Sequence, residues 1–167
     1  MSGLPTPSNR EEFVRALADI YEHSPWVAAT TWDRYHDTPL DTVEALHGRM
    51  SEVLLSADHE AQLALINAHP DLAGKAAVQG RLTAASTGEQ AGAGIHECTP
   101  EEFQRFTELN DAYKAKFGFP FIMAVKGSNR HQILAAFETR IHHEAATEFA
   151  CALAEINKIA LFRLQAL

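Results

Sequence analysis

Three polar residues, far apart in the chain, have side chains suited to acid–base and anion-binding chemistry. His69 stands at the predicted end of a helix, directly before Pro70, and an imidazole exchanges protons near neutral pH with little tuning. Glu89 could orient that imidazole and raise its pKa if the two side chains lie close together. Arg163 offers a planar donor fork for a carboxylate or carbonyl oxygen. The three residue types together favour an acid–base site for a small polar substrate.

Each of these residues also has an explanation that needs no ligand. His69 would suit the negative end of a helix dipole. Ser86 and Glu89 have the spacing of a capping box, which explains both residues structurally. Arg163 lies on the polar side of the last predicted helix, near its end, where a solvated cation is favourable. The sequence leaves both interpretations open.

Three irregular segments separate the predicted helices and are the places where a site is expected. Residues 69–75 and 80–95 are rich in small residues, and residues 117–128 are apolar but interrupted by glycine and proline. Small residues allow a close approach of the backbone to a ligand. Within the second segment, Ser86 and the backbone amides that follow could bind an anion or carbonyl group. Gln90 adds amide donors and an acceptor suited to an amide-like heterocycle.

No pattern of metal ligands or of other catalytic motifs stands out. Cys98 and Cys151 match no metal or redox spacing and are expected to be reduced, mostly buried thiols. His131 and the sequence His142-His143-Glu144 are suggestive, but adjacent helical residues point about 100° apart. No phosphate-binding loop and no Gly-x-Ser-x-Gly element occurs. We therefore expect no tightly bound metal.

The elements that position these residues are predicted to be helices. In the first half, Ser8 and Glu11 are spaced as a capping box, Pro25 ends that helix, and a turn follows through residues 26–30. Thr38-Pro39 and Ser56 are the expected starts of the next two helices. The second of these must end near His69, because proline disfavours helical backbone in the residue before it.

In the second half, the tetrapeptide Thr99-Pro100-Glu101-Glu102 opens a helix that Gly118 is expected to end. Ser128 is the expected start of the next helix, and an apolar stripe over residues 146–164 predicts a long final one. Residues 121–125 form the only extended apolar run, too short to imply a sheet. The fold class is therefore all-α, with seven or eight helices around one core and irregular site-forming loops.

Length and charge limit the classes of partner. The chain has 167 residues and a net charge of −8, which favours one domain over residues 1–167 and argues against nucleic acid or an anionic membrane surface. No apolar window is long enough to span a membrane. The first residues lack the apolar core of a signal peptide, and the last three are not a peroxisomal address. We therefore expect a cytoplasmic protein.

Four segments, in order, resemble the signature sequences of the OHCU decarboxylase family, whose members act on 2-oxo-4-hydroxy-4-carboxy-5-ureidoimidazoline (OHCU). They are HPDLAGK (69–75), LTAASTGEQAGAG (82–94), FGFPFIMAVKG (117–127) and EINKIALFRL (155–164). The resemblance covers nearly the whole chain, with a looser fit in the N-terminal region. It implies an all-helical, cofactor-free and commonly dimeric enzyme that converts OHCU to (S)-allantoin in urate degradation.

The resemblance also implies a role for each matching residue. His69 would be the catalytic acid or base and Pro70 would line the pocket, while Glu89 would hold the imidazole. Arg163 would bind an anionic or carbonyl group of the substrate. The remaining expected substrate-binding residues are Ser86, Thr87, Gly88, Glu89 and Gln90 in one turn, and the backbone of Phe121, Ile122, Met123, Ala124 and Val125.

Decarboxylation of this kind needs no cofactor if the electrons left behind delocalise as an enolate. Hydrogen-bond donors from residues 121–125 or Arg163 could stabilise the developing oxyanion, and His69 could deliver a proton to one face. Two alternatives remain. One is a lyase or hydrolase of another ureide that uses the same pocket, and the other is a non-enzymatic helical module that binds a partner protein.

Overall fold

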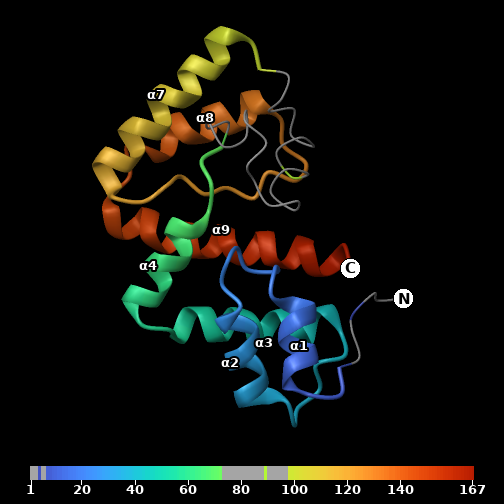
Figure 1. The fold of residues 1–167 in the computed structure, drawn as a ribbon. Coiled ribbons are helices and arrows are strands. Elements are labelled where there is room, and N and C mark those ends of the chain that lie inside the picture. The colour runs from blue at the N-terminus through green and yellow to red at the C-terminus, as the bar shows by residue number, and fades with distance from the viewer. Residues whose placement is uncertain (1–3, 5–6, 73–88, 90–97) are drawn as a thin grey trace. The chain divides into compact units, whose positions relative to one another are not determined.

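The computed structural model describes residues 4, 7–72, 89 and 98–167, and the secondary structure that it assigns there is entirely helical (Figure 1). The prediction of an all-α fold is therefore confirmed. The described helices are α1 (Arg10–Leu17), α2 (Trp26–Tyr35), α3 (Val43–Ser56), α4 (His59–Ala68), α7 (Pro100–Phe117), α8 (Arg130–Arg140) and α9 (Ala145–Gln165). None of these helices is long and apolar enough to cross a membrane.

The chain forms two compact units. Unit 1 consists of Met1–Ala68 and Ile156–Leu167, and unit 2 consists of His69–Glu155. Helix α9 therefore contributes its first half to unit 2 and its second half to unit 1. The assignment of residues 1–167 to a single domain stays a prediction.

Two helix starts in unit 1 differ from the predicted positions by a few residues. The cap of α1 is Asn9, whose side chain accepts a hydrogen bond from the Glu12 amide at 2.9 Å, so the predicted capping box of Ser8 and Glu11 is wrong by one residue. The cap of α3 is Thr42. The Thr38 hydroxyl instead donates to the Tyr35 carbonyl oxygen at 2.6 Å, closing the end of the preceding helix.

The cap of α4 also differs from the predicted residue, because the Ser56 hydroxyl serves the preceding helix. Ser56 is the last residue of α3, and its hydroxyl donates back to the Val53 carbonyl oxygen. Asp58 accepts from the Ala61 amide at 2.8 Å and so caps the first turn of α4. As predicted, α4 ends directly before His69.

The segment after Pro25 is a helix rather than the predicted turn. Pro25 is the residue before the first turn of α2, where its missing amide proton costs no intrahelical bond. Helix α1 also ends earlier than predicted, at Leu17. Ile20 and Tyr21 follow it in non-helical backbone and are still buried.

Unit 2 contains α7, whose two ends follow the predicted signals. The side chain of Thr99 accepts from the Glu102 amide, the Glu102 carboxylate accepts from the Thr99 amide, and Pro100 occupies the first turn. Gly118 ends the helix with a φ of 78°, a conformation that glycine adopts without steric cost. The capping box and the glycine stop are therefore confirmed.

The start of α8 lies one residue beyond the predicted Ser128. The Ser128 amide closes a turn on the Val125 carbonyl oxygen at 2.9 Å. The cap is Asn129, which forms a capping box with Gln132. The extended run at residues 121–125 carries no helix or strand, and the long final helix is confirmed.

Unit 2 has an aromatic core centred on Tyr113 of α7. The rings of Phe121 and Phe137 stack at a centroid distance of 3.9 Å, and Tyr113 meets each of them edge to face. Phe119 packs edge to face on Tyr113 as well. Because such ring pairs have defined geometry, this cluster fixes the path of the chain from residue 119 to residue 121.

Candidate active site

His69 lies directly after α4 and begins unit 2. It is 9% exposed, and the proline that follows is partly buried. Pro70 favours extended backbone at position 69, which ends the helix and turns the chain there. The imidazole is therefore not a solvated helix-end group.

Two side chains of α7 hold the chain just after His69. The Asn110 amide donates to the Leu72 carbonyl oxygen at 2.9 Å, and the Lys114 ammonium pairs with the Asp71 carboxylate at 2.7 Å. Residues 110 and 114 are one helical turn apart and so share a face of α7. This face fixes the backbone on which the histidine stands.

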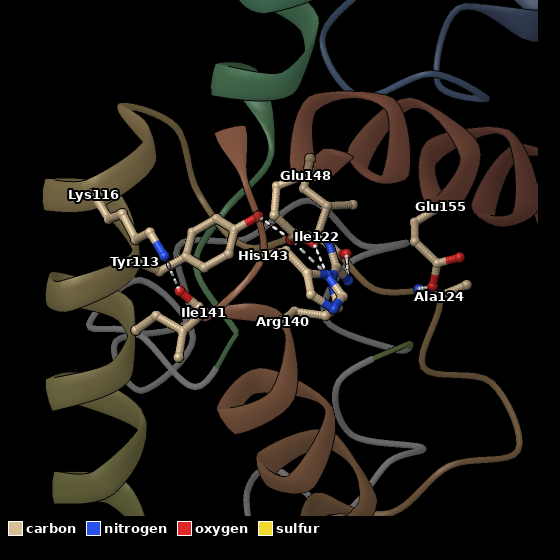
Figure 2. A network of polar contacts seen from close by, with 9 residues as sticks. All are labelled: Tyr113, Lys116, Ile122, Ala124, Arg140, Ile141, His143, Glu148 and Glu155. Atoms are coloured by element: carbon tan, nitrogen blue, oxygen red, sulfur yellow. Dashed lines mark hydrogen bonds and ion pairs between the residues drawn. The ribbon is translucent and has the colours of Figure 1, made fainter. Parts of the chain in front are cut away.

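The extended run at residues 121–125 is held by side chains from α8 and α9 (Figure 2). The Arg140 Nη1 atom donates to the Ile122 carbonyl oxygen at 2.6 Å. The Ala124 amide donates to the Glu155 carboxylate at 3.2 Å. Within the run, Phe121, Ile122 and Val125 are buried, whereas Met123 and Ala124 are partly exposed.

The carboxylate of Glu148, which is 0% exposed, is the centre of a polar network in unit 2. It accepts from the Tyr113 hydroxyl at 2.6 Å and from the Arg140 Nε atom at 2.9 Å, while His143 Nδ1 lies 2.9 Å from its other oxygen. Burial raises the pKa of Tyr113, and the hydrogen bond to Glu148 and the negative charge of that carboxylate raise it further. The Tyr113 hydroxyl therefore stays a proton donor. The network thus balances a buried carboxylate with a buried guanidinium.

Arg163 is buried in unit 1, so the interpretation of it as a solvated cation, one of the two left open, is wrong. Its Nη2 atom lies 2.9 Å from the Glu22 carboxylate, with side-chain exposures of 8% and 1%. Its Nη1 atom donates to the Asp19 carbonyl oxygen at 3.1 Å. Two partners in one short segment therefore fix the direction of this guanidinium.

The local backbone explains why Glu22 points inward. His23, the next residue, has a positive φ of 48°, a conformation that reverses the chain and that histidine adopts more often than most residues do. The Ser24 hydroxyl donates to the Glu22 carbonyl oxygen at 2.9 Å. The segment after α1 is thereby folded tightly around the buried carboxylate.

The predicted site residues are distributed over both units. His69, Pro70, Glu89 and residues 121–125 belong to unit 2, and Arg163 belongs to unit 1. Glu89 has helical backbone and is partly buried. Four further predicted residues, Ser86, Thr87, Gly88 and Gln90, lie outside the described residues.

Sequence reasoning missed several buried polar residues. Glu22, Arg140 and Glu148 carried no motif that separated them from solvated helix charges. His143 was considered only as part of a metal site. Across the described residues, no three His, Cys, Asp or Glu side chains are grouped so that they could hold a metal ion. Cys98 and Cys151 both carry thiols and are partly buried.

Comparison with known proteins gives one consistent family. A family described as OHCU decarboxylase matches residues 7–165. The 2-oxo-4-hydroxy-4-carboxy-5-ureidoimidazoline decarboxylase of Halalkalicoccus jeotgali is 42% identical over 160 residues, which cover 96% of this chain and 87% of that protein. The protein of the same name from Amia calva is 36% identical over 155 residues, which cover 93% of this chain and 87% of that protein.

Two solved structures are similar as well. A crystal structure of (S)-allantoin synthase has a TM-score of 0.76 and 31% identity, and the alignment covers 95% of this chain and 50% of that one. A crystal structure of OHCU decarboxylase in the presence of (S)-allantoin has a TM-score of 0.67 and 21% identity, with 83% and 87% covered; this second likeness shows the fold. Together, the sequence matches show that the chain belongs to the OHCU decarboxylase family.

Proposed function

We propose that this protein removes CO₂ from OHCU and releases (S)-allantoin, as a step of urate degradation. The family match over residues 7–165 carries the proposal, and the relatives named as OHCU decarboxylases support it at up to 42% identity. Within unit 2, a buried histidine on an anchored segment supplies a group suited to proton transfer.

The chemistry requires one bond cleavage and one stereospecific protonation. The bond between the ring carbon and its carboxylate breaks, CO₂ leaves, and the electron pair passes into the ring to give an enol or enolate. A proton then adds to the neighbouring carbon that bears the ureido group, and the hydroxyl carbon becomes a carbonyl. Because either face of that intermediate can be protonated in water, the enzyme's measurable contribution is a single enantiomer.

We assign the protonation to His69, because a buried imidazole can hold and deliver a proton near neutral pH. Glu89 is proposed to orient it, and Pro70 to line the pocket. The turn Ser86–Gln90 and the backbone of residues 121–125 are proposed to bind the ring and its ureido group. The Arg163 guanidinium is proposed to bind the carboxylate or a carbonyl oxygen, with Glu22 and Asp19 fixing its direction.

The oligomeric state and the location of the protein are proposals too. The family resemblance favours a cofactor-free homodimer. A cytoplasmic location is proposed as well. Light scattering during size-exclusion chromatography would show the dimer as twice the mass of 18.4 kDa that one chain has.

The test is turnover of freshly prepared OHCU by the purified protein. Circular dichroism would monitor the allantoin formed, and a CO₂ assay would measure the rate of decarboxylation. The proposal predicts faster CO₂ release than in buffer and a growing signal of (S)-allantoin. Hydantoins and other ureides offered in parallel would be turned over if the protein were instead a lyase or hydrolase of another ureide. Racemic product formed at the rate of the buffer control would contradict the proposal and favour a binding module.

A further inference from the structure

The extended run at residues 121–125 is held at two peptide groups that lie on either side of Met123. Arg140 binds the carbonyl oxygen of Ile122, and Glu155 binds the amide of Ala124. Both contacts are made by ionisable side chains, which form stronger hydrogen bonds than neutral groups do. The Ile122 carbonyl shares a peptide group with the Met123 amide, and the Ala124 amide shares one with the Met123 carbonyl. The two contacts therefore fix the directions of the Met123 N–H and C=O groups.

The first of these contacts is itself held in place by buried partners. Arg140 has a side-chain exposure of 10% and pairs through Nε with the fully buried Glu148. Its guanidinium also lies 4.3 Å from the centre of the Phe121 ring. The arginine thus contacts both the side chain of residue 121 and the backbone of residue 122.

Both acidic residues come from one rigid element. Glu148 and Glu155 are seven residues apart in α9, which places them on the same face about 10 Å apart along the axis. Helix α9 can therefore set the position of Arg140 through Glu148 and of Ala124 through Glu155. A loop held in this way has little freedom to change its backbone directions.

Stability alone gives a weak reason for this arrangement. A buried ion pair recovers little more than its own desolvation cost. In addition, the buried Arg140 Nη2 atom has no hydrogen-bond partner within the part of the chain that the structure describes, and an unsatisfied buried donor is unfavourable. Apolar side chains would fill such a space at lower cost, so a positioning role accounts better for the arginine.

We propose that Arg140 and Glu155 are positioning residues that set the backbone of residues 121–125 for substrate binding. This inference rests on the proposed function, in which that backbone binds the ring of OHCU. Neither residue is assigned contact with the substrate. Their effect is to hold the carbonyl of Ile122 and the amide of Ala124, and with them the peptide groups of Met123.

Three variants, one at Arg140 and a pair at Glu155, test the proposal through KM, kcat and the enantiomeric excess of allantoin. Arg140→Lys keeps the charge but cannot reach Glu148 and Ile122 together. We expect KM to rise about tenfold, the effect of one lost hydrogen bond, with a smaller change in kcat and a lower enantiomeric excess. Glu155→Leu removes the acceptor and should act in the same direction, while Glu155→Gln keeps an acceptor oxygen and should restore most of the wild-type KM.

The control is Thr99→Ala, which removes the cap of α7 in the same unit without touching residues 121–125. Melting temperatures of all variants separate loss of folding from loss of positioning. A wild-type KM and enantiomeric excess in Arg140→Lys and Glu155→Leu would overturn the inference while leaving the proposed function intact. If Arg140→Lys does not fold, the Glu155 pair decides alone. A wild-type protein without activity on OHCU would overturn both proposals.

Discussion

Each of the two units buries an arginine–glutamate pair with one member on α9, and the pairs differ in how they are built. In unit 2, Arg140 and Glu148 are eight residues apart, and Glu148 is also bonded by Tyr113 and lies beside His143. In unit 1, Arg163 and Glu22 are 141 residues apart, and the arginine also binds the backbone of Asp19.

The different partners of the two arginines indicate two different roles for a buried guanidinium. Arg140 acts on the chain itself, since its Nη1 atom binds the backbone of Ile122. Arg163 is the residue that the family resemblance assigns to the substrate, and Glu22 directs it. We therefore expect changes at Arg140 to affect stability first and substrate binding second, and changes at Arg163 to affect turnover first.

The largest expected effect is on folding, in the variant Arg140→Met. This change leaves the carboxylate of Glu148 buried without its cation, which costs about 3–5 kcal/mol of unfolding free energy. Urea denaturation would measure the loss. The double variant with Glu148→Leu should recover most of it, because the uncompensated charge is then gone. No recovery in the double variant would show that the pair does not act as a unit.

The next effect is on turnover, in the variant Arg163→Lys. The lysine keeps a positive charge beside Glu22 but loses the planar fork, so kcat/KM should fall about a hundredfold, as for a lost charge-assisted hydrogen bond. Steady-state kinetics with OHCU would measure it. A smaller fall in kcat/KM for Arg163→Lys than for Arg140→Lys would contradict the expectation that changes at Arg163 have the larger effect on turnover.

A smaller effect is expected for Tyr113→Phe, which removes one donor to Glu148 and keeps the ring. The hydrogen bond to a charged acceptor predicts a loss of about 2 kcal/mol of unfolding free energy. Denaturant titration would detect the loss. An unchanged stability would mean that Arg140 and His143 satisfy the carboxylate without the phenol.

The smallest effect is expected for Thr99→Ala, at the cap of α7. Loss of the cap should cost about 1 kcal/mol and leave KM unchanged, because the cap does not touch residues 121–125. Thermal unfolding and kinetics on the same preparation would test both statements. A raised KM would show that any loss of stability in unit 2 disturbs substrate binding, which would weaken the distinction drawn for Arg140.

Signals confined to a few neighbouring residues were predictable from the sequence. Pro70 ended α4, and Thr99 and Gly118 marked the two ends of α7, because each acts on backbone within one turn. Where two good caps stand close together, the sequence analysis chose the wrong one. Asn9 rather than Ser8 caps α1, and the Thr38 hydroxyl served the helix before it.

The buried charges could not be predicted in this way. One interpretation placed Arg163 in solvent at the end of the last helix, and its contacts with the distant Glu22 and Asp19 explain its burial instead. Arg140 stands in the last turn of α8 and carries no local pattern that separates it from a solvated cation. Its role depends on Ile122 and Glu148, which belong to other elements. Long-range pairs of this kind leave no local pattern in one sequence.

The most direct test of the proposed mechanism is circular dichroism of allantoin formed by His69→Asn. Asparagine keeps a polar side chain of similar size but cannot deliver a proton as imidazole does. The account predicts that enzymatic turnover falls at least about a hundredfold and that the remaining product is racemic. Formation of (S)-allantoin at the wild-type rate would contradict the assignment of His69 as the proton donor.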